Sequence, residues 1–283
     1  MRNIMNILFT SFTAFAALVG CGVFIAIFTV IFYRGLPAIS FEFLTDQIRV
    51  AGASGGIIYN LIGTLILLVS ALLVSAPLAI GIALMQTVFL NNGALKKRLE
   101  LLLYILNGVP SILFGIFGFI VFVKYLGLGK SWLTGGFLLG MMILPTVTIA
   151  LIERIRSIPK KYLEAATGLG LRKSQIIFSV ILPQSMSGLT TGSLLGLARA
   201  AGETAPIMYT ATIFAGATIP TGIKESPVLA LPYHIFVLAQ DAFAPAAIQN
   251  LWGAALVLIL LVFMLSIFVL PLRLKIHEEA HHA

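Results

Sequence analysis

The stretch KKYLEAATGLGLRKSQIIFSVILPQ (Lys160–Gln184) interrupts a chain that is otherwise almost continuously apolar. It contains four basic residues, one glutamate, two alanines and two glycines. Residues 162–168 favour a helix, and the glycines at its end permit a tight bend. The small side chains of Ala165 and Ala166 let another protein approach the backbone closely. The residues alone are compatible with a docking helix that lies along the membrane, and equally with a solvated charged connector.

The composition around this stretch is that of a polytopic membrane protein. Hydrophobic residues make up 59% of the 283 residues and charged residues 10%, with a mean hydropathy of +1.06, whereas about a quarter of a soluble protein is charged. The net charge of +8 would suggest a nucleic-acid partner in a soluble domain, but in a membrane protein basic residues first report orientation, and we expect no nucleic acid here. The single cysteine, Cys21, excludes an internal disulfide and a cysteine-based metal site.

Six segments are apolar over the roughly 20 residues that a helix needs to cross a bilayer. We therefore predict an all-α membrane protein with six spanning helices. Pro77 is expected to divide the second span, and the glycines and prolines between Pro183 and Pro206 to bend or break the fifth. A proline-flanked apolar piece, 228–238, is too short to cross and is expected to re-enter the membrane or lie on its surface. The predicted spans are 7–33, 57–89, 99–123, 133–152, 184–214 and 249–271.

Basic residues decide the orientation of these spans, because short cytoplasmic loops collect Lys and Arg. With the N-terminus inside, 12 of the 18 basic residues lie in inner segments and five in outer ones, and Arg199 falls within a span. Both termini are therefore predicted to face the cytoplasm, as is the opening stretch. We divide the chain into a first helix with an extracytoplasmic loop (1–56), a transmembrane core (57–275) with a cytoplasmic loop (153–175), and a C-terminal tail (276–283).

No catalytic constellation accompanies these features. The sequence GLGLRKS ends in Lys173-Ser174 but has Arg172 where a phosphate-binding loop needs glycine, so nucleotide chemistry is assigned to a partner. The three histidines of the tail fit an unstructured polar end better than a weak metal site, and His234 is expected to be an ordinary satisfied or solvated histidine. The chain is predicted to be no enzyme and to bind neither a metal nor a cofactor itself.

Arg199 and Glu203 lie four residues apart in the apolar run LLGLARAAGETAPIMYT, hence on one helix face. An arginine inside a bilayer costs about 2.5 to 3.5 kcal/mol even on the gentler insertion scale, so it faces the protein interior and has a partner. Two interpretations stay open: a local ion pair that holds a kink near Gly202 and Pro206, and a switchable positive charge in the path of an anion. Nearby hydroxyls that add possible donors belong to Thr190, Thr191, Ser193 and Thr204.

The opening stretch resembles a known motif. The pattern E-A-A-x3-G-x9-V-x-L-P, which runs from Glu164 to Pro183, is similar to the EAA loop in permease subunits of ATP-binding-cassette (ABC) importers, with Val180 where isoleucine is usual. In that family the loop is a coupling helix that sits in a cleft of the cytoplasmic ATPase. The resemblance implies the six-helix type I (MetI-like) permease fold. It assigns ATPase coupling to Glu164, Ala165, Ala166, Gly168, Gly170, Leu182 and Pro183.

A second resemblance narrows the family. The segment ARAAGETAP (198–206) resembles the A-type permease subunit of phosphate importers (PstA), and this implies a substrate path through Arg199, Glu203 and Thr204. MQTVFL (85–90) departs from the acidic, tyrosine-containing version expected after the second span. Supporting similarities are GGIIYNLIGTLILL (55–68), APLAIGIAL (76–84), VPSILFGIFGF (109–119) and LPYHIF (231–236).

The same resemblance implies partners and a location. The partners are a homologous permease (PstC-like), two cytoplasmic ATPases (PstB-like) that bind ATP and magnesium, and an extracytoplasmic phosphate-binding protein (PstS-like), all at the bacterial or archaeal cytoplasmic (inner) membrane. The expected function is translocation of inorganic phosphate. The alternatives are an importer of the same architecture for molybdate, sulfate or an organic solute and, from another class, an ion-gradient carrier that needs no ATPase.

Overall fold

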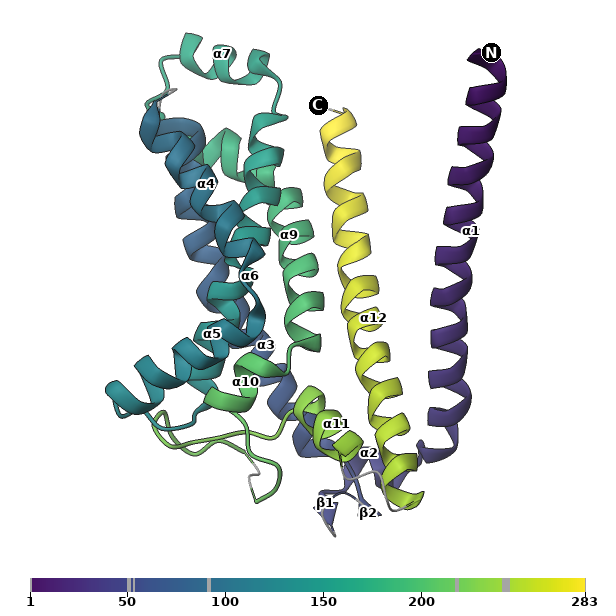
Figure 1. The fold of residues 1–283 in the computed structure, drawn as a ribbon. Helices are drawn as coiled ribbons and strands as arrows, with labels where there is room; N and C mark the ends of the chain where they lie inside the picture. Colours follow the sequence, from purple (N-terminus) through teal and green to yellow (C-terminus); the bar gives the residue numbers. More distant parts are fainter. Residues whose placement is uncertain are drawn as a thin grey trace.

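Helices make up almost all of the regular structure (Figure 1). The structure, a computed structural model, describes residues 2–49, 52, 54–90, 93–216, 219–240 and 245–282. The longer helices are α1 (Arg2–Gly35), α3 (Ile58–Leu84), α4 (Ala94–Gly108), α6 (Trp132–Arg156), α9 (Leu182–Gly202), α11 (Leu231–Gln240) and α12 (Pro245–His282). The shorter ones are η1 (Leu36–Ala38), α2 (Phe41–Thr45), η3 (Met85–Phe89), α5 (Ser111–Gly118), η4 (Phe119–Tyr125), α7 (Lys160–Gly168), α8 (Lys173–Ile176), η5 (Ile177–Ile181) and α10 (Ala205–Thr210). The described strands, β1 (Ile48–Arg49) and β2 (Ser54–Gly55), form one antiparallel pair with Ile48 opposite Gly55.

The core of the molecule is formed by α3, α6 and α9, with α6 packed against both of the others. The α6 side chains Met142, Ile143 and Val147 are fully buried. Glycine lets the helix backbones approach closely: a Cβ on Gly140 would lie 2.9 Å from the carbonyl oxygen of Ala71 in α3. Close contacts of this kind hold helices together in a bilayer, where the surrounding lipid removes the hydrophobic drive for association.

Helix α1 stands apart from this core, beyond α12, and approaches α12 at its C-terminal end (Figure 1). A Cβ on Gly35 would lie 2.6 Å from the carbonyl oxygen of Trp252 in α12, so the two helices touch there. Along the rest of α1 the described apolar side chains, such as Phe12 and Phe24, are exposed. A helix with this composition is stable only where lipid or another protein covers it.

The fold class agrees with the sequence: the chain is an all-α polytopic membrane protein. Four helical segments of the described part are long and apolar enough to cross a membrane, namely Phe9–Ala38, Ile58–Phe89, Trp132–Arg156 and Pro245–Ile267. A fifth crossing results if the bent pair α4–α5 counts as one span. The remaining predicted span, 184–214, is not among these crossings and folds as α9 followed by α10.

The predicted span 99–123 is not one straight helix. The segments Ala94–Gly108 and Ser111–Tyr125 lie at 93° to each other. Pro110 explains the break, because proline has no N–H to donate and disfavours the helical conformation of the residue before it. Val109 is accordingly extended, with φ −67° and ψ 128°.

Of two other predicted breaks, one is wrong and one is confirmed. Pro77 lies inside α3, which runs without a break from Ile58 to Leu84; membrane helices tolerate such a proline because neighbouring groups satisfy the freed carbonyl. Gly188, Gly192 and Gly196 do not break α9, since they face α6. The fifth span does break as predicted near Gly202 and Pro206: α9 ends at Gly202, and Glu203 is extended with ψ 122° before the proline at the start of α10.

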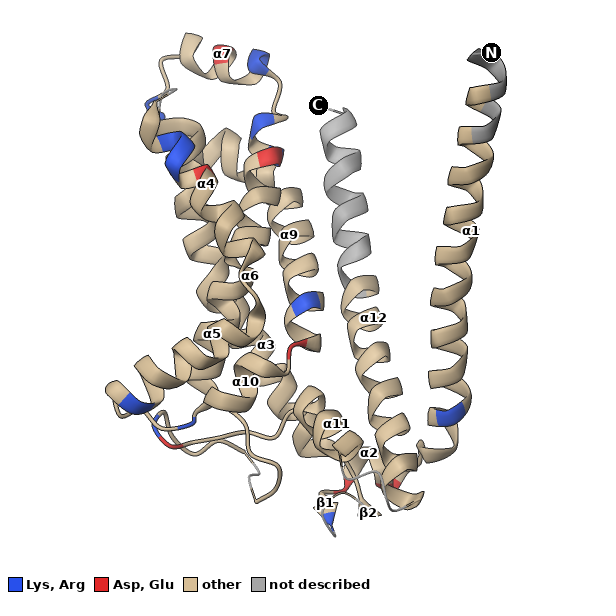
Figure 2. Cartoon of the chain, viewed as in Figure 1, with Lys and Arg blue, Asp and Glu red and all other residues tan. Residues whose placement is uncertain are grey.

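The two ends of the molecule differ in charge. Lys and Arg gather around α7 and the first turns of α4, and fewer lie at the opposite end (Figure 2). The start of α1 and the end of α12 lie toward the same end as α7 (Figure 1). The side chains of the predicted tail 276–283, with its three histidines, lie outside the described part of the chain.

Candidate functional site

Arg199 lies in the last turn of α9, on a helix held against α6 by a row of small residues. A Cβ on Gly192 would lie 2.9 Å from Ala150 Cβ, and one on Gly196 would lie 3.1 Å from Ile143 Cβ. These contacts decide which face of α9 is buried. Arg199 lies beside that face, with 32% of its side chain exposed. Its charge also suits the C-terminal end of a helix, where the carbonyl groups are unpaired.

Glu203 is the predicted partner of Arg199, and the structure brings the two together. Arg199 Nε and Glu203 Oε1 are 3.6 Å apart, and 17% of the Glu203 side chain is exposed. Glu203 does not belong to the helix, however, because α9 ends at Gly202. The pair therefore lies at the break between α9 and α10, as the interpretation of a local ion pair at a kink predicts.

A third residue, Asn107, belongs to this group. It was not predicted from the sequence. Asn107 Oδ1 accepts a hydrogen bond from Arg199 Nη1 at 3.0 Å and a long one from Thr146 Oγ1 at 3.4 Å. Asn107 lies in the last turn of α4, next to the break at Pro110, and Thr146 lies in α6. We call Arg199, Glu203, Asn107 and Thr146 the arginine cluster. In the sequence, Asn107 could have been recognised as an amide side chain that lies in an apolar run, three residues before a proline.

The other hydroxyls proposed as donors are not gathered around Arg199. Thr190 Oγ1 donates to the carbonyl of Ser187 within α9 at 3.0 Å. Thr204 follows Glu203 directly and is half-buried at the start of α10. The hydrogen bonds of the described residues include none that joins Thr191, Ser193 or Thr204 to Arg199.

Helix α10 is fixed at its far end by the segment that precedes α6. Lys130 Nζ donates to the carbonyls of Met208 and Thr212, at 2.9 and 3.1 Å. The backbone N–H of Ser131 donates to the carbonyl of Thr210 at 2.9 Å. The start of α10 thus adjoins the arginine cluster, while its end is tied to the loop before α6.

The predicted coupling residues form a separate group at the other end of α9. Helix α7 lies apart from the spans and roughly across them (Figure 1). Glu164 and Ala165 are exposed, whereas Ala166 is buried against the molecule. Gly168 ends α7, and Gly170 has φ +74°, a left-handed conformation that glycine adopts without strain. The predicted helix with a tight bend is therefore confirmed.

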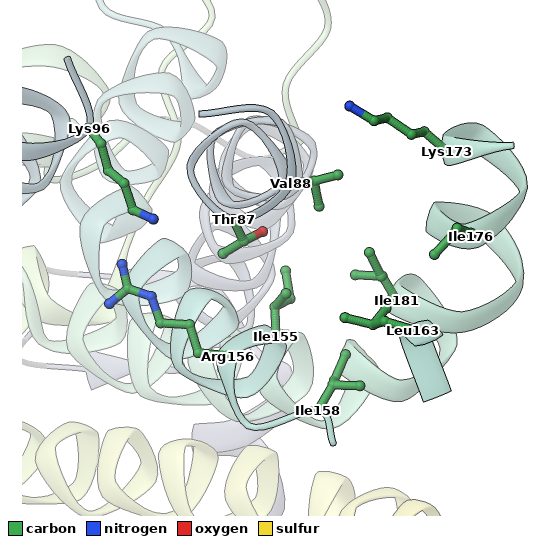
Figure 3. A pocket seen from close by; sticks show the side chains of 10 residues that line it. All are labelled: Thr87, Val88, Lys96, Ile155, Arg156, Ile158, Leu163, Lys173, Ile176 and Ile181. Atoms are coloured by element: carbon green, nitrogen blue, oxygen red, sulfur yellow. The ribbon is translucent and has the colours of Figure 1, made fainter. Parts of the chain in front are cut away.

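Helix α7 packs against the neighbouring ends of other helices through a small group of apolar side chains, which we call the apolar seat. Ala166 belongs to one buried cluster with Ile155, Ile158, Ile176 and Ile181. Beside this cluster lies a cavity of about 370 Å³, shown in Figure 3. The cavity walls are mainly apolar, and three cations stand around it: Lys96, Arg156 and Lys173. Its presence shows that the seat is only partly filled.

Leu182 and Pro183 lie at the start of α9, the helix that runs from the apolar seat to the arginine cluster. They are the first two residues of α9, which follows the π-helical turn η5 directly. Arg154 Nε in α6 donates to the carbonyl of Gln184 at 3.0 Å and so attaches the start of α9 to α6. With 21 residues, α9 is about 30 Å long, and it joins the two groups as one rigid element.

His234 differs from the expected satisfied or solvated histidine. It lies in α11, outside the membrane-spanning segments, and is 2% exposed. Its ring stacks on Phe214, with centroids 5.8 Å apart, and Nδ1 has no hydrogen-bond partner among the described residues. Burial lowers the pKa of His234 from 6.5 to about 4, because the charged form loses its hydration.

The chain is similar to proteins of known class. The family model described as "binding-protein-dependent transport system inner membrane component" matches residues 75–276. The chain is 34% identical to a probable phosphate transport system permease protein PstA of Methanocaldococcus jannaschii, over 87% of this chain and 84% of that protein. It is 30% identical to the phosphate transport system permease protein PstA of Xylella fastidiosa, over 98% and 96% of the two chains.

Among solved structures, the fold is similar to that of the MetNI methionine ABC transporter. The TM-score is 0.58 at 14% sequence identity, and the similarity covers 77% of this chain and 96% of that chain. At this identity the likeness concerns the fold alone. It confirms the MetI-like permease fold expected from the sequence.

Proposed function

The chain belongs to the family of inner membrane components of binding-protein-dependent transport systems, and from that membership we propose that it conducts inorganic phosphate into the cell. It is an ABC importer permease and not an enzyme, and this class works with ATPase partners and a binding protein. The relatives named for phosphate transport support phosphate as the substrate.

The observation that favours an anionic substrate most is the state of Arg199. Its side chain is one-third exposed, and the partners of its guanidinium are a carboxylate at 3.6 Å and the neutral amide of Asn107 at 3.0 Å. A phosphate oxyanion prefers two parallel N–H donors on a planar guanidinium. A single arginine that is partly neutralised by Glu203 binds such an anion weakly enough to release it, as transport requires.

Coupling to ATP follows from the position of α7. We assign contact with the ATPase to Glu164 and Ala165, which are exposed, and to the bend formed by Gly168 and Gly170. The coupling role of Ala166, which is buried beneath α7, and of Leu182 and Pro183 is to pass the movement to the rest of the chain. Closure of the ATPases on ATP pushes α7 against its partly filled apolar seat, and the seat passes the movement to α9. The far end of α9 holds Arg199 and Glu203, so the same displacement reaches the substrate path. A helix packing with two arrangements then alternates access between the two sides.

The remaining assignments concern partners and orientation. The basic end that holds α7, α1's start and α12's end faces the cytoplasm, which agrees with the preference of Lys and Arg for that side. A PstC-like permease completes the pore, two PstB-like ATPases bind α7 and its counterpart, and a PstS-like protein delivers phosphate to the outer loops. The domain division 1–56, 57–275 and 276–283 stays part of this proposal.

Uptake of radiolabelled phosphate by cells that lack other phosphate carriers tests the proposal. We expect Arg199→Gln to lower uptake at least about 10-fold, since one charge-assisted interaction contributes about 1.5 to 3 kcal/mol. Arg199→Lys should keep part of the activity, because it retains the charge and loses the planar pair of donors. Arg49→Gln is the matched control, since Arg49 pairs with Asp46 on an exposed loop remote from α9.

The same assay separates the alternative substrates. Excess unlabelled phosphate should suppress uptake, whereas excess sulfate or molybdate should not. Undiminished uptake by Arg199→Gln at normal protein level would contradict the anion path. If excess sulfate or molybdate suppressed uptake instead, that anion and not phosphate would be the substrate. The assignment as a permease would still hold.

A further inference from the structure

Two helix breaks lie side by side in this fold. One is the 93° bend between α4 and α5, and the other is the break between α9 and α10 at Glu203. The helices that follow the two breaks, α5 and α10, are packed together. A Cβ on Gly115 in α5 would lie 2.7 Å from the carbonyl oxygen of Ala205 in α10. A change in the angle of either break therefore moves the other.

Asn107 joins the two breaks through Arg199. Asn107 precedes Pro110 by three residues, and Arg199 precedes Glu203 by four. The bond from Arg199 Nη1 to Asn107 Oδ1 runs between residues 92 positions apart in the chain. Thr146 Oγ1 donates to the same Oδ1 at 3.4 Å, so α6 shares the connection. Three helices thus meet at one amide oxygen.

The guanidinium offers an oxyanion two edges, and both are partly occupied. The side edge consists of Nε and Nη2, and Glu203 lies 3.6 Å from Nε. The end edge consists of Nη1 and Nη2, and Asn107 occupies Nη1 at 3.0 Å. An anion at the side edge would approach the Glu203 carboxylate and be repelled by it. The end edge is therefore the favourable one, and an anion there competes with Asn107 for Nη1, because the anion and the amide oxygen both accept from that nitrogen and repel each other.

From this geometry we propose that Asn107 is a positioning residue that holds Arg199 while the path is empty and yields it to the entering anion. The inference rests on the proposed function, because it takes the substrate to be an oxyanion bound by Arg199. Without substrate, the hydrogen bond from Arg199 to the Asn107 amide holds the α4–α5 bend against the α9–α10 break. When an anion displaces the amide, this hydrogen bond is lost. Binding of substrate therefore changes how freely the two bent segments move.

Two substitutions of Asn107 should have opposite effects on its contact with Arg199. Asn107→Leu has a similar size and no acceptor, so it removes the hydrogen bond to Arg199. The two helix breaks are then no longer connected, even when no substrate is bound. Asn107→Asp has the same shape and a carboxylate, which pairs with Arg199 and resists displacement by an anion. A change in general packing does not explain a rise of phosphate-free hydrolysis in one variant and its absence in another of nearly equal size.

The test uses the complete transporter in proteoliposomes, with the second permease, the ATPases and the binding protein. We measure ATP hydrolysis without phosphate and phosphate imported per ATP hydrolysed. For Asn107→Leu, phosphate-free hydrolysis should rise about 3- to 10-fold, and import per ATP should fall, since loss of one charge-assisted hydrogen bond changes an equilibrium by about that factor. For Asn107→Asp, hydrolysis should stay low with and without phosphate, and import should fall at least about 10-fold.

Thr146→Val keeps the inference testable if the Asn107 variants do not assemble. It preserves the side-chain size and removes only the second hydrogen bond to Asn107, so it should shift phosphate-free hydrolysis upward by a smaller factor. A rise of phosphate-free ATP hydrolysis in both Asn107 variants, or behaviour like that of the parent in all three variants, would overturn the inference. If Arg199→Gln abolishes import while these variants behave like the parent, the inference fails and the proposed function stands. Normal import by Arg199→Gln would overturn the proposed function itself.

Discussion

At the scale of the residue, the buried imidazole of His234 makes stability depend on pH. Its pKa is about 4 in the folded chain and 6.5 ordinarily, so between these values the unfolded state binds more protons. The free energy of unfolding is therefore unaffected by His234 above about pH 6.5, and it decreases as the pH drops toward 4. The loss is on the order of 3 kcal/mol at pH 4, because each pKa unit corresponds to about 1.4 kcal/mol.

Thermal unfolding of the detergent-solubilised protein between pH 4.5 and 7.5 measures this effect. His234→Phe keeps an aromatic ring against Phe214 and has no group to protonate. The unfolding temperature of the parent should fall relative to that of the variant as the pH is lowered. Parallel curves for the two proteins would show that His234 does not titrate in this way.

The arginine cluster shows which residues a sequence reveals and which it conceals. Arg199 and Glu203 were predictable as a pair, because charges in an apolar run must be partnered and these two are four positions apart. Asn107 and Thr146 were not, because their contacts depend on how three helices pack. The burial of His234 was likewise hidden, since it depends on the stacking of α11 against Phe214.

At the scale of the element, the contact between α9 and α6 decides whether α9 moves as one body. A Cβ on Gly192 would lie 2.9 Å from Ala150 Cβ and 3.0 Å from the backbone of Val147. Gly192→Ala should therefore lower stability by about 1 to 3 kcal/mol, as overpacking of a tight core does. The matched control is Gly81→Ala in α3, where a Cβ meets nothing within 4 Å and alanine favours the helix.

Unfolding temperatures of the two variants provide the measurement. We expect a clear decrease for Gly192→Ala and no decrease for Gly81→Ala. Equal unfolding temperatures would mean that the α6–α9 contact is looser than the structure has it. Import should also fall in Gly192→Ala, since α9 connects α7 to Arg199.

Breaks in helices were harder to predict than helices. Each long apolar run was recognisable, and α7 was correctly placed with its bend at Gly170. Pro77 and Pro110 have the same backbone chemistry, yet only Pro110 breaks a helix. Local sequence does not separate these cases, because neighbouring helices decide whether the freed carbonyl is satisfied. The glycines of α9 were misread for the same reason: they serve contact with α6.

At the scale of the whole molecule, the fold places two functional groups at opposite ends of one helix. Helix α7, with the proposed coupling residues, packs on α8 and η5, which lead into the start of α9, and the arginine cluster lies at the other end of α9. The exposed apolar surface of α1 and the open face of the cluster are consistent with a chain that works inside a larger membrane complex. The sequence predicted this class from the EAA pattern and its composition, whereas the side-by-side helix breaks required the structure.

The position of α7 against an ATPase on the cytoplasmic side is the central claim, and cysteine labelling tests it most directly. In a Cys21→Ser background, Ala165→Cys places a thiol on the exposed face of α7, and Ile219→Cys places one on the predicted outer loop, where Ile219 is 59% exposed. We predict that a membrane-impermeant thiol reagent labels Ala165→Cys only in inside-out vesicles, and that this cysteine cross-links to the ATPase. Ile219→Cys should be labelled only in intact cells. Labelling of Ala165→Cys from outside, or no cross-link to an ATP-hydrolysing partner, would contradict the account.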